Sequence, residues 1–314
     1  MNKKWVVAGL IVGSLLIGEA VARFGLGLGD PPLSVVHPTI EYMYKPNQDV
    51  MRFGKNFIIN HYGMRSENFP IEKSEKELRV MVFGDSVVNG GNLTDHADLA
   101  TTLLENRISD GHKRNVRIGN ISAGSWGPGN WLAYVKEYGF FGADIIILII
   151  SSHDAGDNPI YAPLDTNTHP QIKPTSAMWE GLTRYLPRYL PKFGQTTDLP
   201  VIGQIDEVKA MVQGLTDLKS FLRLALEQTS QVLVVQWPEQ SELSSRKYKT
   251  GYLEIKQVAE EMGVPVISMA QPFLKNMKDG GQPYRDNIHP NDLGQKIIAE
   301  TLYRQLARNE ALGR

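Results

Sequence analysis

The chain has 314 residues, and its 33 lysines and arginines are balanced by 34 aspartates and glutamates, giving a formal net charge of −1. Such a balance offers none of the positive charge that binding to nucleic acid requires, so we expect no nucleic-acid partner. The sequence has no cysteine, which excludes disulfide bonds, cysteine-ligated metal centres and thiol catalysis.

Residues 1–25 predict a membrane anchor or an export signal. Lys3 and Lys4 precede an apolar stretch at 5–18, which Glu19 ends. The stretch is shorter than the roughly 20 residues that usually cross a bilayer, and Ala-Val-Ala at 20–22 has the small-residue pattern of a signal-peptide cleavage site. An uncleaved anchor with its lysines inside is the alternative. We favour the anchor, because cleavage would place the Glu19 carboxylate just before the cut. Either interpretation puts the rest of the chain outside the cytoplasm.

Residues 26–78 predict an irregular, proline-rich lead-in, after which strand-like and helix-like segments alternate through one domain at 79–314. Aliphatic runs predict strands at 79–83, 116–121, 144–150, 232–237 and 264–268. Apolar periodicity predicts helices near 97–109, 128–138, 206–229, 247–262 and 291–308. This alternation predicts a three-layer α/β fold with a parallel sheet of about five strands. Seven prolines interrupt it between 155 and 203, which we interpret as an insertion over one face.

The first loop after a predicted strand carries a candidate nucleophile. In open parallel sheets, sites form where loops leave the carboxyl ends of the strands, and this loop reads Gly84-Asp85-Ser86-Val87-Val88-Asn89-Gly90-Gly91. A serine directly after a strand, on a turn flanked by glycine, can expose both its hydroxyl and its backbone N–H. A lone Ser86 in this place can equally be a helix cap.

The next two loops carry candidate ligand-binding groups. Glycines at 124, 127 and 129 follow the second strand and let the backbone approach a ligand closely. Ser151-Ser152-His153-Asp154 follows the third strand. His153, Asp154 and Asp157 lack the spacing of a metal site, so we expect no metal and no cofactor.

The last candidate precedes the final helix and reads Asp286-Asn287-Ile288-His289-Pro290-Asn291. A carboxylate three residues before a histidine can hold the imidazole Nδ1–H and leave Nε2 as a proton acceptor. The same two residues can also be helix-start residues with Pro290 in the first turn.

In this order, these four features resemble the SGNH (GDSL-type) hydrolase family, in which a Gly-Asp-Ser nucleophile, a glycine, an asparagine and an Asp-x-x-His pair lie on a flavodoxin-like sheet. The resemblance covers roughly residues 79–308. It implies that Ser86 is the nucleophile, His289 the general base and Asp286 the residue that orients it. It also implies an oxyanion hole built from the backbone N–H groups of Ser86 and Gly124.

One block departs from the family pattern. Where the family shows Gly-x-Asn-Asp, this chain has Ser151-Ser152-His153-Asp154, so the expected asparagine donor is missing. A neutral imidazole can still donate one N–H, and Asn158 is a second candidate. We therefore expect His153 or Asn158 to complete the oxyanion hole.

The resemblance implies a serine esterase that acts on carboxylic esters through an acyl-enzyme. The anchor followed by Asn60-His-Tyr-Gly63-Met-Arg65 is similar to membrane-anchored members of the superfamily from bacterial exopolysaccharide systems. That similarity implies O-acetyl esters on a carbohydrate, with the catalytic domain on the periplasmic side of an inner membrane. We expect Trp126, Asn130 and Asp154 to contact this substrate, although each aromatic in these loops can equally be a packing residue.

Two other functions remain open. An O-acyltransferase would use the same triad, and a membrane-tethered polysaccharide-binding or assembly factor would use the scaffold without catalysis. The sequence leaves the oligomeric state open.

Overall fold

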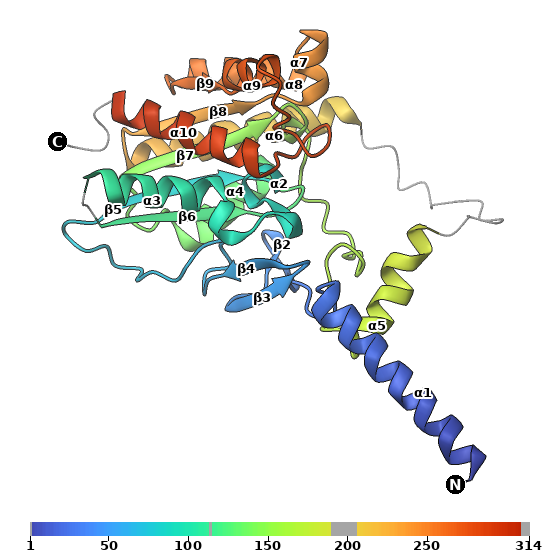
Figure 1. Ribbon diagram of the computed structural model, residues 1–314. Helices are drawn as coiled ribbons and strands as arrows, with labels where there is room; N and C mark the ends of the chain where they lie inside the picture. The colour runs from blue at the N-terminus through green and yellow to red at the C-terminus, as the bar shows by residue number, and fades with distance from the viewer. Residues whose placement is uncertain (1, 113–114, 190–205, 309–314) are drawn as a thin grey trace.

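The computed structural model describes residues 2–112, 115–189 and 206–308 (Figure 1). Part of the predicted insertion, including Pro191 and Pro200, lies outside the described residues. The elements are α1 (Lys3–Ala20), η1 (Val21–Gly25), β1 (Ser34–His37), β2 (Glu41–Tyr44), β3 (Gln48–Arg52), β4 (Lys55–Ile59), β5 (Leu78–Gly84), α2 (Ser86–Asn89), η2 (Gly91–Leu93), η3 (His96–Asp98), α3 (Ala100–His112), β6 (Val116–Ser122), α4 (Pro128–Tyr138), β7 (Ile145–Ser151), η4 (His153–Ala155), α5 (Ala177–Glu180), η5 (Gly181–Tyr185), η6 (Leu186–Arg188), α6 (Glu207–Gln228), β8 (Val232–Trp237), α7 (Gln240–Ser245), α8 (Thr250–Glu261), β9 (Val266–Ser268), α9 (Ala270–Lys278) and α10 (Asp292–Arg308).

The centre of the molecule is a five-stranded sheet in the order β6-β5-β7-β8-β9, and all its strand pairs are parallel. This is the flavodoxin-like order, in which the second strand of the sheet lies outside the first. The predicted three-layer α/β fold is therefore confirmed. The sheet order reverses between β5 and β7, so the loops after these two strands open into the same crevice.

The two faces of the sheet bury alternate residues of each strand. Val80 and Val82 of β5 pack against α3, α9 and α10, whereas Met81 and Phe83 pack against α4, α6 and α8. Every residue of β5, β7 and β8 is buried, because helices cover both faces. This explains why these strands read as continuous apolar runs.

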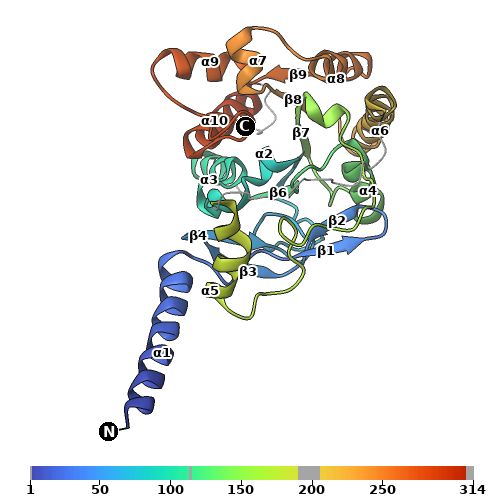
Figure 2. The same cartoon turned by 90° about the vertical axis from the view of Figure 1, so that its right-hand side faces the viewer.

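The prediction of an irregular lead-in is wrong. Two antiparallel hairpins occupy it, β1 with β2 and β3 with β4, and Figure 2 shows them together beneath the main sheet. The prolines that suggested irregular structure lie between the strands, with Pro38 in the turn from β1 to β2 and Pro46 before β3. Prolines are tolerated in turns and outside the hydrogen-bonded ladder, so they did not exclude strands here.

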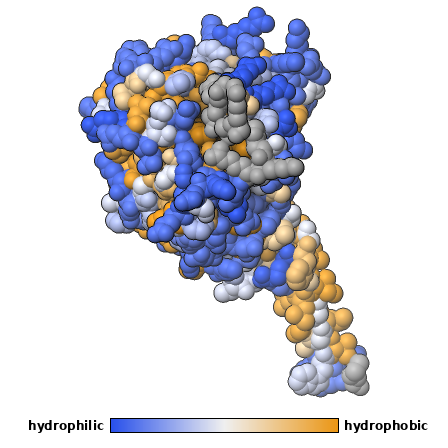
Figure 3. Space-filling model, turned by 90° about the vertical axis from the view of Figure 1, so that its left-hand side faces the viewer, coloured by the Kyte–Doolittle hydropathy of each residue, from blue (hydrophilic) through white to orange (hydrophobic). Residues whose placement is uncertain are grey.

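The segment Lys3–Gly25 projects away from the body (Figure 1). Within the described residues it is the one helical segment long and apolar enough to cross a membrane, and only 6% of its most apolar window is buried. In Figure 3 it is an apolar rod leaving a largely hydrophilic body. A buried core helix is therefore excluded as an explanation of its sequence.

Candidate active site

Ser86 lies at the carboxyl end of β5, where α2 begins. The Asp85 side chain caps this short helix and accepts a hydrogen bond from the Val87 N–H at 2.9 Å. Gly84 makes the tight turn possible, since a Cβ there would lie 2.2 Å from a methyl carbon of Val88 and 3.0 Å from the Ile149 carbonyl oxygen. The turn fixes Ser86 at the crevice between β5 and β7.

Ser86, His289 and Asp286 form a continuous chain of hydrogen bonds. The Ser86 Oγ lies 2.9 Å from His289 Nε2, and His289 Nδ1 lies 2.8 Å from Asp286 Oδ2. The backbone N–H groups of Ile288 and His289 donate to Asp286 Oδ1 at 2.8 Å. Burial raises the pKa of Asp286, but these hydrogen bonds outweigh it and hold the pKa below its ordinary 3.8. Asp286 therefore stays ionised and can orient the imidazole so that Nε2 faces the serine hydroxyl.

Two backbone N–H groups near Ser86 are available to a ligand. No described residue accepts a hydrogen bond from the N–H of Ser86 or of Gly124. The hydroxyl of Tyr42 in β2 donates to the Gly124 carbonyl, so the lead-in fixes the loop that carries Gly124. Free N–H groups beside a nucleophile are suited to stabilising an oxyanion.

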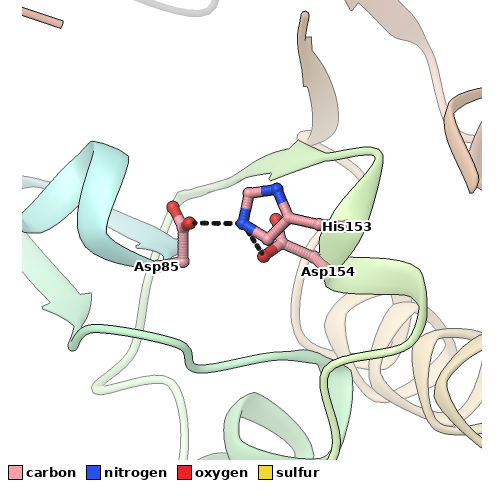
Figure 4. A group of neighbouring side chains, drawn as sticks. All are labelled: Asp85, His153 and Asp154. Carbon is pink, nitrogen blue, oxygen red and sulfur yellow. Dashed lines mark hydrogen bonds and ion pairs between the residues drawn. The ribbon is translucent and has the colours of Figure 1, made fainter. Parts of the chain in front are cut away.

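His153 is turned toward two buried carboxylates, those of Asp85 and Asp154 (Figure 4). Its Nε2 lies 3.3 Å from Asp85 Oδ2 and 3.4 Å from Asp154 Oδ1, and its Nδ1 lies 3.8 Å from Glu239 Oε1. Burial lowers the pKa of His153, but the surrounding carboxylates, first among them Asp85, outweigh it and raise the pKa to about 10. His153 is therefore an imidazolium near neutral pH, whereas the sequence suggested a neutral donor.

The His153 charge acts on the nucleophile through Asp85. The Oδ2 of Asp85 lies 3.3 Å from the Ser86 Oγ as well as 3.3 Å from His153 Nε2. Asp85 is 1% exposed, and a buried carboxylate beside a forming oxyanion raises its energy unless a positive charge balances it. The geometry thus makes His153 the counter-ion of Asp85.

Asp85, His153 and Asp154 are also the group, within the described part of the chain, whose ligand atoms lie closely enough to hold a metal ion, all within 4.8 Å of one another. A metal ligand must be the neutral imidazole. The pKa of His153 is raised to about 10, because the neighbouring carboxylates stabilise the protonated imidazole. A metal ion would therefore have to displace a proton from His153. The imidazolium offsets the charge of Asp85, and burial together with the Asp85 charge raises the pKa of Asp154, which favours the neutral acid there.

Two residues expected to contact substrate are buried instead. Trp126 is 1% exposed, and its Nε1 donates to the Tyr42 carbonyl at 3.0 Å. Asn130 is fully buried, donates to the Ile40 carbonyl at 2.7 Å and accepts from the Gly127 N–H at 2.9 Å. Both side chains anchor the lead-in to the start of α4, so their predicted contact with substrate is wrong.

Asp154 and Asn158 also have structural partners. Asp154 is fully buried and accepts from the Ser151 N–H at 2.6 Å, so it cannot reach a substrate. The Asn158 amide donates to the carbonyls of Gly156 and Ala210 at 3.2 and 2.7 Å. Asn158 lines a different cavity from the one that holds Ser86, so its proposed place in the oxyanion hole is corrected as well.

A cavity of about 400 Å³ contains Ser86 and His289. Its walls come from four parts of the chain: the lead-in, the segment from Ser86 to Leu93, the 155–203 insertion and the loop before α10. Besides the triad, it is lined by Phe53, Gly90, Gly91, Asn92, Leu93, Asn167, Thr168, Arg184, Tyr185 and Arg285. Tyr185 belongs to the predicted insertion, whereas Phe53 and Arg285 carried no signal in the sequence.

A buried ion pair joins two of these walls. Arg52, next to Phe53, donates to both carboxylate oxygens of Glu180 at 2.6 and 3.0 Å, and it also donates to the Tyr185 hydroxyl at 2.7 Å. The Arg52 side chain is fully buried and that of Glu180 is 4% exposed. The lead-in and the insertion therefore form one connected wall over the triad.

No family model and no curated protein matches the sequence, whereas several solved structures match about three quarters of the chain. An acetyl xylan esterase matches with 14% identity and a TM-score of 0.48, covering 73% of this chain and 100% of its own. A member of the lipolytic G-D-S-L family from Veillonella parvula matches with 13% identity and a TM-score of 0.45, covering 74% of this chain and 99% of its own. A lipase/acylhydrolase from Enterococcus faecalis matches with 12% identity and a TM-score of 0.47, covering 74% of this chain and 96% of its own. At these values the likeness decides neither activity nor substrate, and both depend on the side chains of the site.

Proposed function

We propose that the chain is a serine esterase that cleaves carboxylic esters. The observation that carries this proposal is the hydrogen-bonded chain from Ser86 Oγ through His289 to Asp286, with heavy-atom distances of 2.9 and 2.8 Å. These distances are within the reach that proton transfer requires. The cavity above Ser86 gives an ester room to approach the hydroxyl.

The reaction follows from these positions. His289 Nε2 takes the hydroxyl proton while Ser86 Oγ bonds to the carbonyl carbon, and the carbonyl π electrons move to the oxygen. The resulting oxyanion accepts hydrogen bonds from the N–H groups of Ser86 and Gly124. As the C–O bond to the leaving group breaks, the alcohol takes the proton from His289 and an acyl-enzyme remains. Water, deprotonated by His289, then attacks this ester and releases the acid and the free serine.

His153 contributes through charge in this mechanism. Asp85 Oδ2 lies 3.3 Å from the Ser86 Oγ, so its negative charge opposes the formation of an oxyanion nearby. The imidazolium of His153, at 3.3 Å from the same oxygen, offsets that charge. We place His153 as a positioning and charge-balancing residue rather than as an oxyanion donor.

The cavity favours a small acyl group on a polar carrier, and we propose O-acetyl esters of a carbohydrate as the substrate. Phe53 and Tyr185 offer ring faces, and Asn92, Asn167 and Arg285 offer polar groups in the same cavity. Aromatic faces with convergent hydrogen-bonding groups are suited to a sugar. An anchored chain of this kind would work on the periplasmic side of a bacterial inner membrane.

The test is labelling of the detergent-solubilised full chain with a fluorophosphonate probe, together with hydrolysis of p-nitrophenyl acetate. We expect Ser86→Ala to lose the label and to lower kcat on the order of 10⁶-fold, as in hydrolases whose nucleophile is removed. Ser244→Ala is the matched control, because Ser244 is an exposed serine whose hydroxyl donates to the Gln240 carbonyl. This variant should keep both the label and the esterase activity. Labelling that survives Ser86→Ala would refute the assignment.

Product analysis with an acyl donor and an oligosaccharide acceptor separates hydrolysis from transfer. Free acid indicates an esterase, whereas an acylated oligosaccharide indicates that a sugar hydroxyl replaces water in the second step. A wild-type chain that neither takes the label nor turns over an ester would instead be a binding or assembly factor.

A further inference from the structure

We propose that the helical segment 177–189 lies against the phospholipid bilayer beside α1, with one side toward lipid and the other toward the catalytic cavity. The segment consists of α5, η5 and η6, which follow one another without a gap up to Tyr189. It is part of the predicted insertion, and nothing in its sequence alone marked it as a membrane contact.

The inner side of this segment belongs to the domain. Ala177 and Glu180 are buried, and Glu180 is paired with Arg52 at 2.6 Å. Arg184 and Tyr185, on the same side, line the cavity that contains Ser86. This side is therefore fixed against the lead-in and faces the triad.

The outer side exposes large apolar side chains. The exposed fractions are 59% for Trp179, 47% for Leu182, 43% for Leu186 and 84% for Tyr189. These four positions recur at intervals of three and four residues along the segment, between the buried Ala177 and Glu180 and the cavity-lining Arg184 and Tyr185. A helix with an apolar, tryptophan- and leucine-bearing face on one side and polar contacts on the other is typical of membrane-surface helices.

The lipid bilayer is the occupant indicated by the contact with α1. The Glu19 carboxylate at the end of α1 accepts from the Ser176 hydroxyl at 2.7 Å and from the N–H groups of Ala177 and Met178 at 3.0 Å. Ala22 and Ala177 pack together in a small buried cluster. In both Figure 1 and Figure 2 the two segments lie side by side where they meet. The exposed apolar face of 177–189 therefore begins where the candidate membrane span ends.

The same contacts support retention of the N-terminal segment. Cleavage after Ala22 would remove Glu19 and leave the first N–H groups of α5 without their acceptor. It would also uncover Ala177, which is fully buried. Glu19 thus caps the wall of the active site, and we infer that the anchor is retained.

One consequence concerns the substrate. A single helix, about 10 Å across with its side chains, would separate lipid from the cavity at Ser86. An acylated carbohydrate held at the membrane surface could then reach the cavity without leaving that surface. This consequence depends on the proposed esterase activity, whereas the lipid contact itself does not.

Site-directed fluorescence on the full chain in phosphatidylcholine nanodiscs tests the lipid contact. The chain has no cysteine, so Leu182→Cys and Leu186→Cys each carry a single environment-sensitive NBD label. Leu253→Cys is the matched control, because Leu253 is a leucine of similar exposure, 55%, on α8. We expect spin-labelled lipid to quench the labels at 182 and 186 at least about twofold, as for interfacial side chains, and to leave the label at 253 unchanged.

Equal responses at all three positions would overturn the proposal. The intact mass of the chain purified from membranes tests whether the N-terminal segment is retained. A mass that corresponds to a chain beginning near residue 23 would overturn the inference that the anchor is retained. The quenching is repeated in the Ser86→Ala background. Quenching should persist in that background, because the lipid contact does not depend on catalysis. A wild-type chain that is quenched but hydrolyses no ester would refute the esterase proposal alone, whereas an active wild-type chain without quenching would refute the lipid contact alone.

Discussion

His153→Gln should make the stability of the chain less dependent on pH. In the folded chain the pKa of His153 is raised from 6.5 to about 10, so the unfolded chain releases this proton at a lower pH than the folded chain does. The stabilisation is fully present below about pH 6.5 and is lost as the pH rises toward 10. At about 1.4 kcal/mol for each pH unit, the difference between 6.5 and about 10 amounts to an advantage of about 5 kcal/mol for the wild type over the variant. Removing one partner of a buried ion pair costs a similar ~3–5 kcal/mol.

Guanidinium unfolding of the detergent-solubilised chain, followed by tryptophan fluorescence between pH 6.5 and 9.5, measures this difference. We expect the free-energy gap between wild type and His153→Gln to shrink steadily over that range. His96→Gln is the control: burial, with a smaller effect of Arg65, lowers the pKa of His96 to about 4. His96 is therefore neutral in both states above pH 7.5, and its variant should keep a constant gap. A gap that stays constant for His153→Gln as well would refute the imidazolium assignment.

Three further substitutions test the site and its walls. Asp286→Asn should lower kcat on p-nitrophenyl acetate by about 10²–10⁴-fold, because the amide no longer holds the His289 tautomer; unchanged kcat would contradict its role. Trp126→Phe should lower the free energy of unfolding by about 1–3 kcal/mol, because it loses a hydrogen bond and leaves a small void. It should leave kcat/KM unchanged, and a raised KM would instead indicate that Trp126 contacts the substrate. Arg52→Ala should lower the free energy of unfolding by about 3–5 kcal/mol in denaturant titration, because it leaves a buried charge unpaired. Arg304→Ala, the control in an exposed ion pair, should lower it by less than about 1 kcal/mol. Equal losses of stability in the two variants would contradict a stabilising role of the buried pair.

The sheet and the grouping of Ser86, His289 and Asp286 could be predicted from sequence because their signals are local. The five strands read as aliphatic runs since both faces of the sheet are buried, and Ser86, Asp286 and His289 lie on short motifs at predicted strand or helix ends. Proximity of Ser86 to His289, 203 residues apart, was expected from the family resemblance and from the rule that sites gather at the carboxyl edge of a parallel sheet.

The orientation of loop side chains could not be predicted in this way. Trp126 and Asn130 lie on the loop expected to border the site, but carbonyls of the lead-in, at Tyr42 and Ile40, accept their hydrogen bonds and bury them. His153 stands in the position expected for a donor, yet its direction is set by Asp85, 68 residues away. Such partners leave no pattern within the loop itself.

The walls of the cavity connect catalysis to the membrane segment through charge. The α/β body supplies Ser86 and His289, the proposed nucleophile and base, but Phe53 and Tyr185 come from the lead-in and the insertion. Because the ion pair between Arg52 and Glu180 is almost fully buried, separating these two walls would leave charges in an apolar environment, at a cost of several kcal/mol. The walls therefore hold together, and Glu19 ties the insertion to α1 at the start of the same helix. The cavity at Ser86 is thus bordered by segments attached to the N-terminal helix, so if the proposed esterase is correct, we expect substrate choice to respond to changes in these segments more than to changes in the sheet.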